Sequence, residues 1–260
     1  MDSRPLYIPV ILGTPRKGRM SEHVARLLAG EVAKQPGVET ELIDIRSLPL
    51  PTDDAGEAIK DGGFSHKMDR ADGLVIVSPE YNHGYCGLLK HLLDSCLKEY
   101  IHKAVGIVGV SAGPFGGTRV IENMLPVMRE LGLVTIFWDV NFSTVHNRFN
   151  AEGDLPDTSY IRRVDKFLKE LIWMSQTLRH GREHISLQSI AQRRIRTLNL
   201  GPDMGEKIKC PRCGAEMNHH ADKLLASDSE LTSRPALGST LIELHSCPAC
   251  GSSASRYVPA

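Results

Sequence analysis

The sequence predicts an α/β protein in which helices cover both faces of an open parallel sheet, followed by a small metal-binding module. Between residues 6 and 140, short apolar runs alternate with segments whose apolar residues recur at helical spacing. Repeated strand–helix alternation is typical of a parallel sheet covered on both faces. The C-terminal part instead carries two Cys-x-x-Cys pairs, and 260 residues leave room for one full domain and one small one.

The elements follow in order from the residue pattern. Each expected strand is a short apolar run, and each expected helix has an apolar face with a period near 3.6 residues. Breaks such as Pro36-Gly37 and Ser78-Pro79 mark element ends. The expected strands are Leu6 to Leu12, Glu39 to Ile45, Gly73 to Val77, Ala104 to Val110 and Val134 to Val140. The expected helices are Ser21 to Lys34, a short one after the loop 46–66, Gly87 to Tyr100, Thr118 to Leu131, and one from Tyr160 to about His180.

The overall composition is that of an ordinary globular protein. The chain has 31 basic and 31 acidic residues and a pI near 7.2, so its net charge does not point to nucleic acid or an acidic membrane. No apolar run approaches the roughly 18 residues of a spanning helix, and the N-terminal residues lack a signal-peptide pattern. A cytoplasmic location is therefore expected, and paired cysteines there indicate a metal rather than a disulfide.

The turn between the first strand and the first helix has the features of an anion site. It runs from Gly13 to Ser21. Backbone N–H groups converge at such a turn, and the helix N-terminus adds partial positive charge. Thr14 and Ser21 add hydroxyl groups, and Arg16 and Arg19 are available as cations.

Two common phosphate loops do not match this turn. A Walker loop needs lysine and a magnesium-binding hydroxyl after its second glycine, but Arg19 and Met20 follow Gly18. A Rossmann loop has a second glycine where this chain has Pro15. A loop built from hydroxyls and amides suits the phosphate of flavin mononucleotide (FMN), which needs no metal.

Two further loops follow expected strands and carry residues suited to a flat ligand. Residues 78–84 include Tyr81, which is able to stack on or flank a ring, and Asn82, which is able to bond its polar edge. Residues 111–117 contain three glycines, which allow backbone amides to approach a ligand closely. Ligands of open parallel sheets bind beyond the carboxyl ends of the strands, so the three loops are expected to form one site.

These motifs together resemble the NADPH-dependent FMN reductase family, which is flavodoxin-like and includes quinone, azo-dye and chromate reductases. The resemblance covers roughly residues 5–180. It implies a doubly wound sheet of five parallel strands in the order 2-1-3-4-5. The residues that carry it are Gly13-Thr14-x-Arg16 with Ser21, Pro79-Glu80-Tyr81-Asn82-His83-Gly84 with Leu88-Leu89-Lys90 and Asp94, and Ser111-Ala112-Gly113 with Gly116-Gly117.

The resemblance also implies a set of FMN-binding residues. Thr14, Arg16, Ser21 and His23 are expected around the phosphate; Pro79, Glu80, Tyr81 and Asn82 along the isoalloxazine ring; and Ser111, Gly113, Gly116 and Gly117 over it. The chain departs from the family at His23 and His91, where asparagine is usual, and at Cys86, where proline is usual.

The function implied is reduction of a quinone, a flavin or another small acceptor by NADPH or NADH, with hydride passing through bound FMN. Because the flavin supplies the electron chemistry, no catalytic acid or base is nominated. Members of the family commonly form homodimers or homotetramers. A second reading remains open: a flavin-based redox sensor or electron-transfer protein whose C-terminal module docks nucleic acid or a protein partner.

The C-terminal module is expected to bind zinc through Cys210, Cys213, Cys247 and Cys250. Each Cys-x-x-Cys turn points two thiolates at one ion, and two such turns complete a tetrahedral site. The knuckles resemble those of zinc ribbons. Rubredoxins hold iron similarly but pack aromatic residues around it, and none lies between these two pairs, so zinc is favoured over iron. The expected division is a flavin domain over 1–181, a linker over 182–204 and a zinc ribbon over 205–260.

Overall fold

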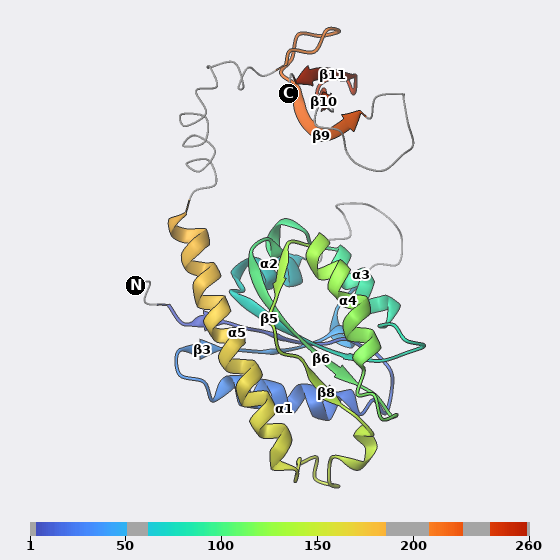
Figure 1. The fold of residues 1–260 in the computed structure, drawn as a ribbon, viewed down its shortest axis with the longest axis vertical. Coiled ribbons are helices and arrows are strands. Elements are labelled where there is room, and N and C mark those ends of the chain that lie inside the picture. Colours follow the sequence, from blue (N-terminus) through green and yellow to red (C-terminus); the bar gives the residue numbers. More distant parts are fainter. Residues whose placement is uncertain (1–3, 51–61, 186–207, 226–239, 259–260) are drawn as a thin grey trace. The chain divides into compact units, whose positions relative to one another are not determined.

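The computed structural model describes residues 4–50, 62–185, 208–225 and 240–258 (Figure 1). The chain divides into two compact units, Met1–Ser186 and Leu187–Ala260. Most of the expected linker 182–204 and part of the loop 46–66 lie outside the described residues. Among the described helices, none is long and apolar enough to cross a membrane.

The first unit is built on a parallel sheet. Its strands are β2 (Val10–Leu12), β4 (Leu42–Asp44), β5 (Gly73–Pro79), β6 (Lys103–Val110), β7 (Leu133–Thr135) and β8 (Val140–Phe142). They lie in the order β4-β2-β5-β6-β7, with β8 also paired to β6. Counted along the chain, this is the predicted order 2-1-3-4-5. The long central strands β5 and β6 are buried throughout, as expected of a sheet covered on both faces.

Three expected strands are interrupted. The first divides into β1 (Leu6–Tyr7) and β2, and the second into β3 (Val38–Glu39) and β4, with β1 paired to β3. Pro9 lies at the first interruption, and proline has no N–H to donate to a ladder. The prediction of one continuous strand from Val134 to Val140 is wrong. β7 pairs with the start of β6 and β8 with its end, while Phe137 between them is 79% exposed.

Two layers of helix cover the sheet (Figure 1). On one face lie α1 (Ser21–Ala33) and α5 (Thr158–His184), which pack on residues such as Val75 and Val108. On the other face lie α2 (Gly62–Arg70), α3 (Gly87–Asp94) and α4 (Thr118–Glu130), which pack on Ile76 and Ile107. Alternate residues of one strand therefore point into opposite cores.

Two helix ends differ from expectation. The helix predicted from Gly87 to Tyr100 stops at Asp94 and is followed by a 3-10 turn, η3 (Lys98–Tyr100). α5 continues past Gly181 to His184, into residues expected to begin the linker. Its extra turn carries Arg182, which donates to Asp72 and to the carbonyl of His102, so contacts with the sheet extend the helix.

The second unit contains three antiparallel strands. They are β9 (Asn218–Leu225), β10 (Thr240–Ser246) and β11 (Ser253–Val258), in the order β11-β10-β9. The segment 226–239 between β9 and β10 lies outside the described residues.

Candidate functional site

A cleft of about 310 Å³ lies where β2, β5 and β6 end at their carboxyl ends. The loops after these three strands form its walls, as the topology of an open parallel sheet predicts. The residues lining it are Arg16, Lys17, Gly18, Arg19, Met20, Ser21, Pro79, Glu80, Tyr81, Val110, Ser111, Ala112 and Val145. Six of the twelve residues predicted to bind FMN are therefore in its wall: Arg16, Ser21, Pro79, Glu80, Tyr81 and Ser111.

Residues 13–20 form the turn before α1, called the phosphate loop below. Thr14 in this loop is fully buried, and its hydroxyl lies 3.0 Å from the hydroxyl of Tyr81. The same Thr14 oxygen accepts a weak hydrogen bond from the backbone N–H of Arg16 at 3.4 Å. Thr14 therefore joins the phosphate loop to the loop after β5, directly behind the cleft.

Arg19 is not available to a ligand in the way the sequence suggests. Its guanidinium is buried, donates to both oxygens of the Asp44 carboxylate, and also donates to the carbonyl of Thr14. Burial opposes ionisation of Asp44, but the hydrogen bonds from Arg19 and from the Arg46 backbone N–H lower its pKa below the ordinary value. Arg19 thus anchors the loop to the end of β4.

Two buried polar atoms in the cleft wall have no hydrogen-bond partner in the described part of the chain. They are the hydroxyl oxygen of Ser21 and one carboxylate oxygen of Glu80. Burying a polar atom without a hydrogen-bond partner costs free energy. The N-terminus of a helix, where Ser21 lies, is also a position at which an anion is stabilised. The Ser21 hydroxyl therefore suits the phosphate of FMN, and the other Glu80 oxygen accepts from Arg119 at 3.3 Å.

The loop after β5 makes a tight two-residue turn. Tyr81 and Gly84 exchange both backbone hydrogen bonds, at 2.8 and 2.9 Å. Asn82 and His83 between them have φ values of 49° and 68°. This pattern is that of a type I′ turn, where asparagine is favoured. Asn82 is consequently a turn residue, and the structure does not place it in the cleft wall.

None of the three predicted glycines after β6, Gly113, Gly116 and Gly117, is in the cleft wall. Ser111 lines the cleft, and its hydroxyl donates to the carbonyl of Gly113, which also accepts from Thr144. Gly116 and Gly117 are outside the cleft wall. A Cβ on Gly116 would lie 2.7 Å from Asn141, and one on Gly117 would lie 2.6 Å from the nitrogen of Val110. These two glycines allow the loop to pack against the sheet.

His23 lies outside the cleft wall as well. Its ring stacks on Phe149 with 5.3 Å between centroids, and it lines a neighbouring hollow of about 690 Å³ together with Gly153. Val145, which the residue pattern does not predict, also enters the cleft wall from the segment after β8. No local pattern marks Val145, because only the path of the chain after the last strand brings it to the site.

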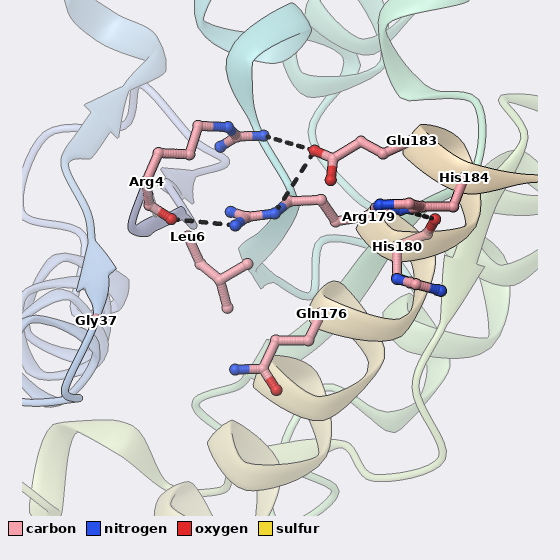
Figure 2. A pocket seen from close by; sticks show the side chains of 8 residues that line it. All are labelled: Arg4, Leu6, Gly37, Gln176, Arg179, His180, Glu183 and His184. Atoms are coloured by element: carbon pink, nitrogen blue, oxygen red, sulfur yellow. Dashed lines mark hydrogen bonds and ion pairs between the residues drawn. The ribbon is translucent and has the colours of Figure 1, made fainter. Parts of the chain in front are cut away.

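A second hollow, of about 640 Å³, lies between the N-terminal segment and the last turns of α5 (Figure 2). Its arginines already have acceptors within the protein. Arg179 donates to the carbonyl of Arg4, and both side chains form ion pairs with Glu183 and with the fully buried Asp72. The cluster therefore ties β1 to α5, which is a structural role.

The four predicted metal ligands meet in the second unit. The sulfurs of Cys210, Cys213, Cys247 and Cys250 all lie within 4.8 Å of one another. Two of the separations are 3.6 and 3.5 Å, near the ~3.8 Å expected for a tetrahedron of sulfurs around zinc. Backbone N–H groups of Arg212 and Cys213 lower the pKa of Cys210, and hydrogen bonds from Ser252 lower that of Cys250 to about 6. For Cys213 the backbone N–H of Ala215 lowers the pKa, but hydrogen bonds shared with Cys247 and Cys250 outweigh it and raise the pKa to about 12. The donor set and its spacing fit a zinc ion.

Comparison with known proteins gives consistent results for the first unit. The sequence model of a family described as NADPH-dependent FMN reductase matches residues 6–147. An NAD(P)H-dependent FMN reductase from Pseudomonas aeruginosa is 28% identical over 63% of this chain and 92% of its own length. A 2-hydroxy-1,4-benzoquinone reductase from a Burkholderia species is 30% identical over 65% of this chain and 96% of its own. The solved structure of the flavoenzyme FerB from Paracoccus denitrificans shares the fold, with a TM-score of 0.56 and 20% identity over 66% of this chain and 98% of its own.

Proposed function

This chain belongs to the NADPH-dependent FMN reductase family and is a flavin-dependent NAD(P)H oxidoreductase, and we propose that it holds FMN in the cleft at the ends of β2, β5 and β6. The phosphate lies at the phosphate loop, near Arg16, Lys17 and Ser21. The ring system lies along the segment 79–81 and beside Ser111. FMN supplies hydride transfer between the nicotinamide and an acceptor, and the protein supplies position and local charge.

The observation that carries this placement is the buried hydroxyl of Ser21, which has no partner among the described residues. It lies at the start of α1, beside a loop with cationic side chains at Arg16 and Lys17. No acceptor in the described part of the chain reaches the backbone N–H groups of Lys17 and Gly18. Unused donors, cations and a helix N-terminus together favour a phosphate over a neutral ligand.

The experiment is an absorption spectrum of the purified full chain, followed by turnover assays. Flavin bands that survive gel filtration, or that return on adding FMN to colourless protein, are expected. NADPH or NADH oxidation should then accelerate when a benzoquinone is supplied. A protein that stays colourless after incubation with FMN contradicts the proposal. Flavin binding without turnover would favour the redox-sensor reading instead.

Small acceptors are proposed from the names of the relatives. Those names include a 2-hydroxy-1,4-benzoquinone reductase and an NADPH azoreductase, and this chain shares their family. The proposed acceptor is therefore a quinone, a free flavin or a similar small molecule. We also propose a homodimer or homotetramer, which light scattering coupled to size exclusion tests directly.

For the second unit we propose a structural zinc ion bound by the four cysteines. Elemental analysis should find one zinc per chain and no comparable iron. Cys247→Ser should lose the metal, whereas Cys86→Ser, which lies outside the cluster, should retain it. Iron at this position, with the absorption of an iron–thiolate centre, would favour electron transfer over a structural role.

A further inference from the structure

Three consecutive carbonyl groups of the phosphate loop accept hydrogen bonds from arginine side chains, one from within the loop and two from outside it. The carbonyl of Thr14 accepts from Arg19. The carbonyls of Pro15 and Arg16 both accept from Arg46, at 3.0 Å from Nε and 2.6 Å from a terminal nitrogen. Arg46 lies in η1 (Ile45–Ser47), the 3-10 turn after β4, thirty residues along the chain from Arg16. It lies outside the cleft wall.

Holding a carbonyl also orients the amide that follows it. In a trans peptide unit the C=O and the next N–H point in opposite directions, and the described residues contain no cis peptide. The unit after Thr14 offers no donor, because the next residue is Pro15. The two units held by Arg46 therefore point the N–H groups of Arg16 and Lys17 away from Arg46. The Arg16 N–H already donates to the Thr14 hydroxyl oxygen at 3.4 Å, so the Lys17 N–H is the one left for a ligand among the described residues. Arg16 and Lys17 are cleft residues.

Arg46 is itself held in place by the end of β4. Its backbone N–H donates to the Asp44 carboxylate at 3.0 Å, and the same carboxylate accepts from Arg19. Ser47 donates to the Asp44 carbonyl at 2.8 Å and closes the turn. The backbone of Arg46 is thus held by the end of β4 and by η1, and its guanidinium reaches the phosphate loop from there.

We propose that Arg46 is a positioning residue for the phosphate site: by holding the carbonyls of Pro15 and Arg16, it fixes the phosphate loop and directs the amide of Lys17 at the phosphate of FMN. This inference rests on the proposed function. Arg46 would act only on the phosphate, the group that FMN has and riboflavin lacks. Loss of Arg46 should therefore weaken the binding of FMN but not that of riboflavin. The planar fork of Arg46 suits two acceptors at once, which an ammonium group does not reproduce.

The test compares FMN and riboflavin binding to the full chain, stripped of flavin, by titration of flavin fluorescence. The variants are Arg46→Ala and Arg46→Lys. The control is Arg26→Ala, which removes an exposed arginine that pairs with Glu22 on α1 and, among the described residues, with no other carboxylate. Arg46, like Arg26, is exposed, so both Arg46 variants are expected to unfold at the same temperature as the wild type. A thermal melt checks this.

Arg46→Ala should weaken FMN binding about tenfold, the loss expected from two hydrogen bonds that position the loop, while riboflavin binding changes less than about twofold. Arg46→Lys should show most of the same loss, and Arg26→Ala none. The inference is overturned if Arg46→Ala binds FMN like the wild type, if it loses both flavins equally, or if Arg46→Lys restores full affinity. Failure of the wild-type chain to bind FMN would instead overturn the proposed function, and this inference with it.

Discussion

The hydroxyl groups of Thr14 and Tyr81 lie 3.0 Å apart and join two loops that are 67 residues apart in the sequence. Thr14 is a fully buried residue of the phosphate loop, and Tyr81 lines the cleft. The guanidinium of Arg16 lies 5.7 Å from the centre of the Tyr81 ring, on the same side of the site. This bond therefore sets the distance between the expected positions of the phosphate and the flavin ring.

Tyr81→Phe removes the bond and keeps the ring. A neutral hydrogen bond contributes about 1 kcal/mol, so FMN affinity is expected to fall roughly fivefold, and Thr14→Val should fall similarly. Tyr85→Phe is the control, because it is the same substitution four residues away and outside the cleft wall. Isothermal titration with FMN measures the effect. Unchanged affinity in both cleft variants would show that the bond does not position the ligand.

Ser21→Ala separates ligand binding from stability. The Ser21 hydroxyl has no partner among the described residues, so its loss should leave the free energy of unfolding of flavin-free protein unchanged or slightly higher. FMN affinity should fall by roughly tenfold or more, because a hydrogen bond to a charged phosphate is lost.

Ser175→Ala is the matched control for this variant. Ser175 also has a buried hydroxyl without a partner in the described part of the chain, but it lies on α5 and outside the cleft wall. It should change neither stability nor FMN affinity. Equal FMN affinity in the Ser21 and Ser175 variants would argue against phosphate binding at the start of α1.

Asp72 is the buried acceptor shared by Arg4, Arg179 and Arg182, and it should be critical for stability. Its fully buried carboxylate also accepts from the backbone N–H of Tyr7. Removing one partner of a buried charge cluster leaves the others uncompensated, so Asp72→Ala should lower the free energy of unfolding by about 3 kcal/mol or more.

Urea unfolding followed by tryptophan fluorescence tests this, because both tryptophans, Trp138 and Trp173, are in the first unit. Asp165→Ala removes an exposed carboxylate that pairs with Lys169 one helical turn away, and it should cost less than about 0.5 kcal/mol. Equal losses in the two variants would contradict the role assigned to Asp72.

Lys103 gives a pH dependence of defined sign. Its ammonium group is buried and donates to the carbonyls of Met68 and Asp69 at the end of α2. Burial, and the nearby charge of Arg182, lower its pKa from 10.5 to about 8. Between pH 8 and 10.5 the unfolded chain therefore binds more protons at this group than the folded one, so stability rises with pH.

Relative to Lys103→Met, the wild type should gain on the order of 2 kcal/mol of unfolding free energy between pH 8 and pH 10. Urea titrations at several pH values measure both proteins, and groups common to both cancel in the difference. If the unfolding free energies of the two proteins change equally with pH across this range, the pKa of Lys103 is not lowered.

Strand–helix alternation predicted the parallel sheet, and the resemblance to a flavodoxin-like family predicted the order of its strands. The breaks in the strands were not predicted. Nothing local to Val134–Val140 shows that its two ends pair with opposite ends of β6 while Phe137 projects outward. Pairing depends on the neighbouring strand, and that neighbour is far away in the sequence.

The candidate site, like the sheet, has some features that the sequence predicts and others that only the tertiary structure shows. Residue type and position at strand ends determined that Arg16, Ser21, Tyr81 and Ser111 face one cleft, because the carboxyl ends of parallel strands meet at one edge. The tertiary structure alone decided that Arg19 is bound to Asp44, that Arg46 holds the phosphate loop, and that His23 and Gly117 face other parts of the protein. Hydrogen-bond partners and close packing depend on which distant segments are brought within a few ångströms, and a local pattern of residues does not contain that information.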